Sequence, residues 1–304
     1  MTEGPLAQTV AVLLNPTAGR GRHRSAVAGI LAALRSGGRP VQVLAASSAV
    51  DAVAACRKAV DDGAAALVAV GGDGTLHLAL QAAAGTGVPF GIVPGGTGND
   101  FAVQMGMAAD PVEAARQIAE ALAAGRHRPV DLARMVGPDG EVRWYAAVLA
   151  AGFDAIVNER ANAMRWPRGP LRYDLATYVE LAKLRPRRYT LTLDGVVHEL
   201  DAVLVAVGNT ASYGGGMRIT PHAVADDGLL DVVVAGPISR ATLVRLKPRL
   251  YTGTHVEHPQ CSTFRASTVE IASDRPIVTY VDGERGHPLP VRITAEPGAL
   301  SLLA

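Results

Sequence analysis

Two short stretches combine glycines with polar side chains in a way that could bind phosphate groups. The first, 71–75, reads Gly-Gly-Asp-Gly-Thr and follows the apolar run 66–70; the second, 94–100, reads Pro-Gly-Gly-Thr-Gly-Asn-Asp and follows the run 90–93. Glycines let a backbone approach a phosphate closely and take positive φ, while exposed N–H groups and a helix N-terminus attract anions. The pattern predicts a nucleotide phosphate site. Its polar groups are Asp73, Thr75, Thr97, Asn99 and Asp100.

The glycine spacing separates this site from two other phosphate loops. No Gly-Lys-Ser/Thr follows, which excludes a Walker loop, and the spacing differs from the dinucleotide-binding fingerprint. Two acidic turns lie further along the chain, Asp-Asp-Gly-Leu-Leu-Asp at 226–231 and Asp-Gly-Glu at 282–284. Taken alone, each is typical of a turn between strands.

Strands and helices must bring these loops together. Up to residue 127 the chain alternates strand and helix patterns, which predicts a doubly wound parallel sheet that binds ligands at the carboxyl ends of its strands. From residue 128 short β-type runs dominate, including Val142–Ala150 and Glu199–Val207, with helices expected near 171–184 and 240–251. These runs favour an antiparallel β-sandwich. The expected fold is α/β plus β, with a domain boundary near residue 127.

Composition excludes several classes of protein. The 304 residues are 49% apolar and 19% charged, as in an ordered globular protein, and a net charge of +1 gives no nucleic-acid footprint. The two cysteines form no metal or disulfide pattern, which fits a reduced cytoplasmic setting. The first residues lack a signal-peptide pattern, and no apolar run approaches the ~20 residues of a membrane span. We expect a cytoplasmic protein with no nucleic-acid partner and no transmembrane segment.

Taken together, the motifs resemble the catalytic domain of the diacylglycerol kinase family, which includes bacterial soluble diacylglycerol kinases and has sphingosine and ceramide kinases as relatives. The resemblance rests on segments in the family's order, at 15–19 (Asn-Pro-Thr-Ala-Gly), 71–75, 94–101, 152–155, 214–217, 226–231 and 282–284. It implies an ATP- and Mg²⁺-dependent lipid kinase, with diacylglycerol the favoured substrate. It also implies an NAD-kinase-like α/β nucleotide domain (1–127, with 292–304 returning to it) and a β-sandwich substrate domain (128–291) around an interdomain active site.

The resemblance assigns residues to the nucleotide. Those expected to contact ATP are Asn15, Pro16, Thr17, Ala18, Gly19, Gly71, Gly72, Asp73, Gly74, Thr75, Thr97 and Asn99. Relatives carry a further threonine after the second strand, where this chain has Ala-Ala-Ser-Ser at 45–48. Either Ser47 or Ser48 could substitute for it.

The resemblance also assigns the chemistry. Glu284 is the expected general base, assisted or oriented by Asp282, because a lipid hydroxyl must lose its proton as it attacks the γ-phosphorus. Asp73 and Asp282 are both candidates to hold the catalytic Mg²⁺, and their order is left open. Relatives place a structural Mg²⁺ at the 226–231 loop; the matching positions are Asp227 and the backbone carbonyls of Val224 and Leu229. Asp154 is expected either to cap a helix or to contact the active site.

Two rival functions remain, an NAD kinase, which shares the Gly-Gly-Asp-Gly-Thr turn, and a nucleotide-binding regulator without turnover. The 94–100 loop and the acidic turns favour the lipid kinase.

The basic stretch 159–188, interleaved with Trp166, Tyr173 and Tyr178, is either a solvated helical face or a docking surface for anionic lipid at the inner membrane surface. An exposed sheet edge in the second domain could support a homodimer.

Overall fold

The chain forms two compact units in a computed structural model that describes residues 6–15, 26–96, 98–164, 166 and 170–304. The first unit comprises Met1–Leu132 with Glu296–Ala304, and the second comprises Ala133–Ala295. Two strands run from one unit into the other, β5 (Arg128–Val136) and β16 (Val291–Leu302). Each unit is described below by itself.

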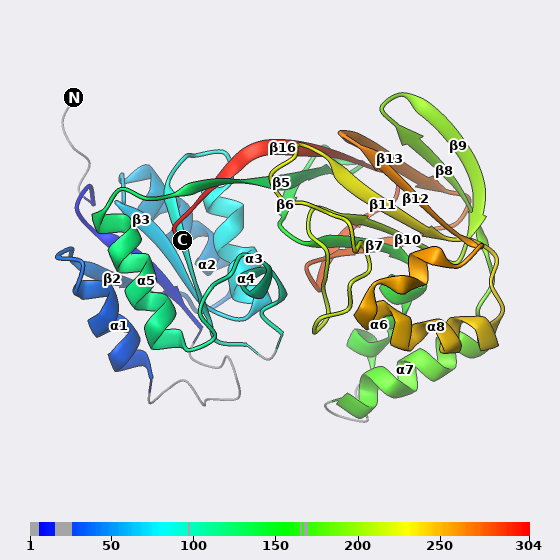
Figure 1. The fold of residues 1–304 in the computed structure, drawn as a ribbon, viewed down its shortest axis with the longest axis horizontal. Coiled ribbons are helices and arrows are strands. Elements are labelled where there is room, and N and C mark those ends of the chain that lie inside the picture. The colour runs from blue at the N-terminus through cyan, green and yellow to red at the C-terminus, as the bar shows by residue number, and fades with distance from the viewer. Residues whose placement is uncertain (1–5, 16–25, 97, 165, 167–169) are drawn as a thin grey trace. The chain divides into compact units, whose positions relative to one another are not determined.

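The first unit is a parallel β-sheet with helices on both faces (Figure 1). Its strands lie in the order β2-β1-β3-β4, and the end of β16 adds a further parallel strand beside β4. Helix α1 packs with α5, and α2 packs with α3. The elements are β1 (Val10–Leu14), α1 (Val27–Arg35), β2 (Val41–Leu44), α2 (Ala49–Asp61), β3 (Ala66–Gly71), α3 (Asp73–Ala83), β4 (Pro89–Pro94), α4 (Asp100–Gln104) and α5 (Pro111–Ala123).

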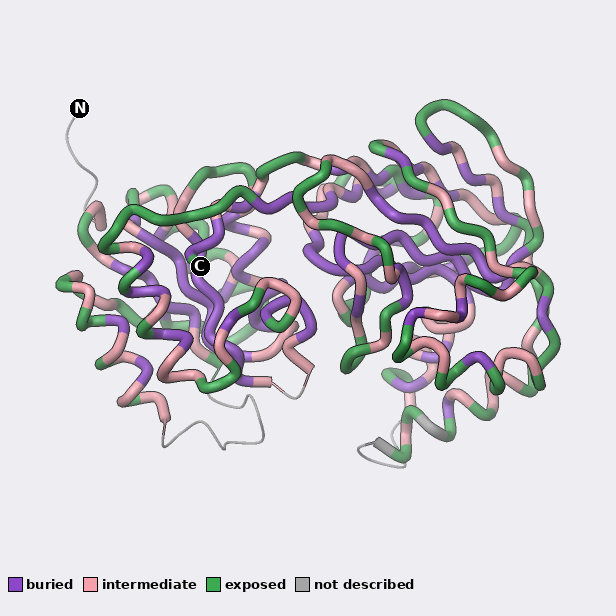
Figure 2. Tube along the Cα trace, in the orientation of Figure 1, coloured by how far each residue is buried: buried purple, intermediate pink, exposed green. Residues whose placement is uncertain are grey.

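Local sequence explains several of these elements. All six residues of β3 are buried, as expected of a central strand covered by helices on both faces (Figure 2). Helix α5 begins where Asp110 Oδ1 accepts hydrogen bonds from the N–H groups of Val112 and Glu113, at 3.0 and 2.9 Å, with Pro111 at the first helical position. The predicted parallel α/β sheet is therefore confirmed.

The second unit is an antiparallel sandwich. One sheet has the order β12-β11-β10-β7-β14-β15, and the other pairs β13 with β16 and β8, and β8 with β9; β5 and β6 form a hairpin. Residues of both sheets share one apolar core, which includes Leu149, Val205, Leu191 and Ile271. The elements not yet given are β6 (Val142–Tyr145), β7 (Val148–Gly152), α6 (Phe153–Ala163), α7 (Pro170–Ala182), β8 (Arg187–Leu193), β9 (Val196–Ala202), β10 (Leu204–Gly208), β11 (Leu230–Ala235), α8 (Arg240–Thr252), a 3-10 helix (Thr254–Glu257), β12 (Cys261–Ala266), β13 (Thr268–Ser273), β14 (Val278–Val281) and β15 (Glu284–Pro288).

Two runs that the sequence predicts as single strands are each broken. The run 142–150 divides into β6 and β7 because the N–H groups of Ala146 and Ala147 donate to the Asp282 carboxylate, at 2.9 and 2.8 Å, instead of to a strand. The run 199–207 divides at Val203, where the chain passes from the sheet of β9 to the sheet of β10. Among the described helices, none is long and apolar enough to cross a lipid bilayer.

Candidate active site

The two glycine loops lie backbone against backbone at the ends of β3 and β4. Gly95 N–H donates to the Gly71 carbonyl at 2.7 Å. A Cβ atom on Gly96 would lie 2.6 Å from Gly72 Cα, and one on Gly72 would lie 3.0 Å from Gly96 Cα. None of these four glycines has a positive φ. Glycine is needed here for close approach, whereas the sequence also suggested positive φ as a reason.

Asp73 and Asn99 hold the two loops together. Asp73, the first residue of α3, accepts a hydrogen bond through Oδ2 from the Asn99 N–H at 2.9 Å. Asn99 has the left-handed backbone (φ 58°), and its side chain accepts from Gly96 N–H at 2.8 Å and donates to Gly96 O at 3.1 Å. Thr75 is buried beside Gly71. Predicted nucleotide residues from both loops are thus brought to the N-terminus of α3, where a helix favours an anion.

Asn15 and Ser47, which are also predicted to contact the nucleotide, lie after β1 and β2. Asn15 follows β1, and its N–H donates to Val70 O at 3.2 Å. Ser47 Oγ donates to the Asp51 carboxylate, and Ser48 Oγ accepts from Asp51 N–H at 3.1 Å. Both hydroxyls therefore form hydrogen bonds with the first turn of α2. The hydrogen bond from Ser47 is the main cause that lowers the pKa of Asp51. The residues 16–19 and 97 lie outside the described part of the chain.

Asp282 and Glu284 flank a tight turn between β14 and β15. Val281 pairs with Glu284, and Asp282 and Gly283 have φ values of 52° and 85°, as a two-residue type I′ hairpin requires. The two carboxylate oxygens of Asp282 each accept a backbone N–H, from Ala146 and Ala147. Glu284 is exposed. The turn therefore holds Asp282 in a fixed place and leaves the Glu284 side chain at the surface of the unit.

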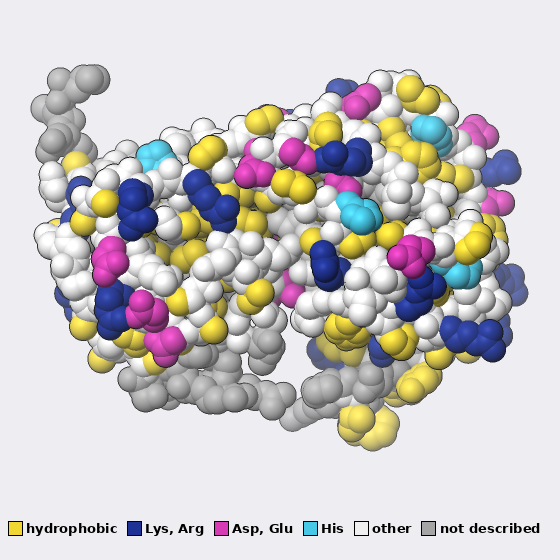
Figure 3. Space-filling model, viewed as in Figure 1, with side chains coloured by type: hydrophobic (Ala, Val, Ile, Leu, Met, Phe, Trp, Pro, Cys, Tyr) yellow, Lys and Arg dark blue, Asp and Glu magenta, His cyan; other side chains and the backbone are white. Residues whose placement is uncertain are grey.

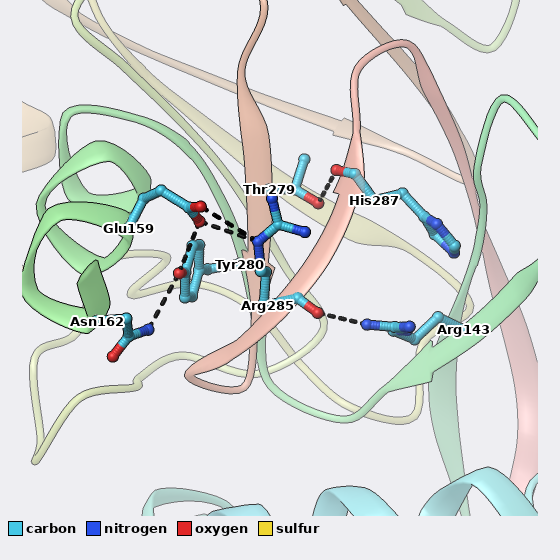
Figure 4. Close-up of polar contacts among 7 residues, drawn as sticks. All are labelled: Arg143, Glu159, Asn162, Thr279, Tyr280, Arg285 and His287. Atoms are coloured by element: carbon cyan, nitrogen blue, oxygen red, sulfur yellow. Dashed lines mark hydrogen bonds and ion pairs between the residues drawn. The ribbon is translucent and has the colours of Figure 1, made fainter. Parts of the chain in front are cut away.

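A polar network ties this hairpin to α6 (Figure 4). Arg285 Nε donates to both carboxylate oxygens of Glu159, at 3.3 and 3.1 Å. Tyr280 OH donates to Glu159 at 3.0 Å and accepts from Asn162 Nδ2 at 3.1 Å. The hydrogen bond from Arg285 is the largest cause of the lowered pKa of Glu159. Because Arg285 follows Glu284 directly, this network restrains the strand that carries the expected base.

Asp154 lies at the start of α6 and has a partner that the sequence analysis did not identify. Tyr213 OH donates to Asp154 Oδ2 at 2.6 Å, and Asp154 Oδ1 accepts the Ala155 N–H at 2.9 Å. Burial raises the pKa of Asp154, and the hydrogen bond from Tyr213 offsets part of that rise. Burial also raises the pKa of Tyr213 well above its ordinary value. The signal that could have found Tyr213 is its position directly before the Gly-Gly-Gly-Met motif at 214–217.

In the 226–231 loop, where a structural Mg²⁺ is expected, Asp227 is paired with an arginine side chain. The Arg265 guanidinium pairs with the Asp227 carboxylate and lies 3.3 Å from Asp231 Oδ2. Asp227 Oδ1 also accepts from Leu229 N–H at 3.0 Å. A divalent cation on Asp227 would have to compete with this guanidinium, so the donor set fits Mg²⁺ poorly as it stands. The Mg²⁺ site on Asp227, Val224 and Leu229 stays a prediction.

Comparisons with known proteins agree with these motifs. The family model for the diacylglycerol kinase catalytic domain matches residues 9–135, and the model for the YegS C-terminal NAD kinase beta sandwich-like domain matches residues 147–304. A diacylglycerol kinase from Mycobacterium tuberculosis (strain ATCC 25618 / H37Rv) is 42% identical over 295 residues, covering 97% of this chain and 94% of the relative. The chain belongs to the diacylglycerol kinase family. It is an ATP-dependent lipid kinase.

Other members of the family agree in sequence or in fold. A Stenotrophomonas maltophilia protein named "Probable lipid kinase YegS-like" is 32% identical, covering 81% of this kinase and 80% of the relative. The crystal structure of a diacylglycerol kinase from Bacillus anthracis str. Sterne superposes with a TM-score of 0.70 at 20% identity, covering 98% and 97% of the two chains. At that identity the structural likeness shows the fold alone. The predicted fold class and family resemblance are both confirmed.

Proposed function

We propose that this lipid kinase transfers the γ-phosphoryl group of ATP to the free hydroxyl of diacylglycerol, giving phosphatidate. The observation that carries the proposal is the 42% identity to a protein named diacylglycerol kinase along nearly the whole chain. The packed glycine loops support it, because they lie at the N-terminus of α3, where a helix favours an anion. In this proposal the described residues of the nucleotide site are Asn15, Ser47, Gly71, Gly72, Asp73, Gly74, Thr75 and Asn99.

The proposed reaction assigns one role to each carboxylate. The Glu284 carboxylate accepts the hydroxyl proton as the lipid oxygen bonds to the γ-phosphorus, and the bond from phosphorus to the β–γ bridging oxygen breaks to release ADP. Asp282, held by two backbone N–H groups, positions the turn that carries Glu284. Mg²⁺ bound with ATP would supply charge neutralisation at the phosphates. Asp73 and Asp282, which both accept backbone hydrogen bonds, are the candidates to hold that ion.

A phosphorylation assay tests the substrate. The purified kinase is incubated with γ-labelled ATP, Mg²⁺ and mixed micelles of diacylglycerol, with ceramide, sphingosine or NAD in parallel reactions. We expect label in phosphatidate at a rate well above the other acceptors. Label that appears in NAD or in a sphingolipid instead, or in none of these acceptors, would contradict the proposal for diacylglycerol.

We further propose that the kinase takes its substrate from an anionic membrane surface while residing in the cytoplasm. Side chains of α7 and α8 line an open groove: Tyr178, Leu181, Ala182, Arg240, Ala241, Val244 and Arg245. Tyr178 is 70% exposed and Val244 is 54% exposed. Figure 3 shows basic and hydrophobic side chains together over these helices. Exposed aromatics beside arginines suit the headgroup region of anionic lipid.

Several arginines of the basic stretch 159–188, which the sequence suggested as a docking surface, have partners within the second unit. Arg160 pairs with Glu180, Arg188 lies 3.8 Å from Asp201, and Arg187 donates to Pro276 O at 3.3 Å. Arg160 is therefore paired with α7 and Arg187 with a backbone carbonyl, whereas the 3.8 Å pair of Arg188 is between exposed side chains and is weak. Arg240 and Arg245 of α8 are exposed, line the same groove as Tyr178 of α7, and were not part of the predicted surface. The docking surface is better defined by α7 and α8 together.

Charge reversal tests this surface. The double variant Arg240→Glu/Arg245→Glu is expected to lower binding to phosphatidylglycerol-containing vesicles at least about tenfold, because each basic side chain near an anionic surface contributes ~1 kcal/mol. Sedimentation with the vesicles measures it. The matched control is Arg57→Glu/Lys58→Glu on α2, which reverses the same charge elsewhere. Equal binding by the two variants would exclude the α7–α8 surface.

Homodimer formation stays a prediction. The edge strands of the second unit include β6, β9, β12 and β15, and β9 exposes Val196 and Val197 at 59% and 60%. Light scattering decides it: a dimer has twice the mass of the 31.4 kDa chain, and a mass of one chain at all concentrations would exclude it.

A further inference from the structure

Three metal-binding side chains to which the proposed reaction assigns no role converge in the second unit. One imidazole nitrogen of His287 and one carboxylate oxygen each from Asp139 and Glu141 lie within 4.8 Å of one another. Asp139 and Glu141 come from the loop of the β5–β6 hairpin, and His287 comes from β15. A nitrogen and two carboxylate oxygens form a donor set typical of divalent transition metals rather than of Mg²⁺.

The hairpin loop has a defined conformation that presents the two carboxylates. Gly137 N–H donates to Glu141 O and Gly140 N–H donates to Gly137 O, both at 3.0 Å. Asp139 Oδ1 accepts from Glu141 N–H at 3.0 Å, which fixes the direction of that side chain. Both acidic side chains are exposed to solvent. A cation from solution could therefore reach them without any change in the fold.

His287 is the part of the cluster that an ordinary acidic loop would lack. Its side chain is buried at 4% exposure, and Nε2 has no hydrogen-bond partner among the described residues. A Cβ on Gly137 would lie 2.6 Å from both Cγ and Nδ1 of the ring and 3.0 Å from Asp139 Oδ1, so the imidazole covers the hairpin loop beside that carboxylate. Thr279 Oγ1 donates to His287 O at 2.8 Å and fixes the backbone (Figure 4). A ring nitrogen that is buried without a partner is costly, and a cation bound at Nε2 would remove that cost.

The positively charged side chain of Arg143 lies near the cluster of Asp139, Glu141 and His287. Its Nη2 lies 3.8 Å from Glu141 Oε1, while its Nη1 donates to Arg285 O, so the guanidinium is directed mainly at β15. A partly exposed pair at that separation contributes little, and a divalent ion can displace it. We propose that Asp139, Glu141 and His287 bind one divalent transition-metal ion, represented by Zn²⁺, which joins the β5–β6 hairpin to β15.

Metal binding to the full chain tests the proposal. After removal of metals with a chelator, the wild-type protein is expected to bind one equivalent of Zn²⁺ at this cluster in equilibrium dialysis without ATP, with a rise in Tm. The double variant Asp139→Asn/Glu141→Gln, which changes exposed side chains only, is expected to lower Zn²⁺ affinity at least about tenfold. The matched control is Asp201→Asn/Glu199→Gln on β9, an exposed acidic pair with the same spacing and a similar 3.8 Å arginine contact.

The histidine is tested separately, because His287→Gln changes a buried side chain and could unfold the protein. Co²⁺ added to wild-type protein is expected to give a paramagnetically shifted imidazole N–H signal that is absent in Asp139→Asn/Glu141→Gln. Loss of both Zn²⁺ affinity and this signal in that variant, with both kept in the β9 control, supports the site. Unchanged Zn²⁺ affinity in the variant, or wild-type protein that binds no Zn²⁺, overturns it.

Discussion

Replacing Glu284 with glutamine is expected to lower the turnover number for lipid phosphorylation by about 10²–10⁴-fold, the range of a general base. The amide keeps the size of the side chain but cannot accept the hydroxyl proton. Glu284 is exposed at the first position of β15 and forms no part of a core, so folding should be unaffected. The KM for ATP is expected to stay within a few-fold of wild type, which steady-state kinetics with diacylglycerol micelles would measure.

Two further variants show whether Glu284 acts as a base or has a structural role. Glu199→Gln changes an equally exposed glutamate on β9 and should leave turnover unchanged. Asp282→Asn replaces one accepting oxygen with a donor that faces a backbone N–H, so we expect a loss of about 1–3 kcal/mol in the free energy of unfolding. If Glu284→Gln retained activity within a few-fold of wild type, the base would have to be another group.

Gly96→Ala is expected to weaken ATP binding at least about tenfold and to lower the free energy of unfolding by about 1–3 kcal/mol. The added Cβ would lie 2.6 Å from Gly72 Cα and 3.0 Å from Asn99 Oδ1. Neither neighbour is the end of a flexible side chain that can move aside, because Gly72 presents backbone and Asn99 is held by Gly96 itself. The two loops must separate, and the proposed phosphate site at the N-terminus of α3 is distorted with them.

Calorimetric titration with ATP and denaturant unfolding would measure the two effects. Gly29→Ala on α1 is the control, since its new Cβ would meet only Val112 Cγ2 at 3.2 Å, and glycine in a helix costs about 1 kcal/mol relative to alanine. We expect that control to keep wild-type ATP affinity. Wild-type affinity in Gly96→Ala as well would show that the contact between the loops has no role in nucleotide binding.

Several features of the fold follow from residues close together in the chain. Asp110 and Pro111 start α5 through hydrogen bonds two and three residues away, and the Asp-Gly pair at 282–283 sets a type I′ turn through its own φ values. The sequence-based boundary at residue 127 lies near the end of the first unit at Leu132. Strand breaks were missed, because the break after β6 depends on an acceptor 136 residues away.

The family, the two glycine loops and the residues expected to carry the chemistry can be predicted from the amino-acid sequence, because short motifs encode backbone geometry and donor types. Which side chains come into contact depends on the folded chain. It placed Tyr213 on Asp154, Arg265 on Asp227 and His287 over the 137–141 loop. These partners lie between 38 and about 150 residues apart in the chain, so sheet pairing rather than local propensity brings them into contact.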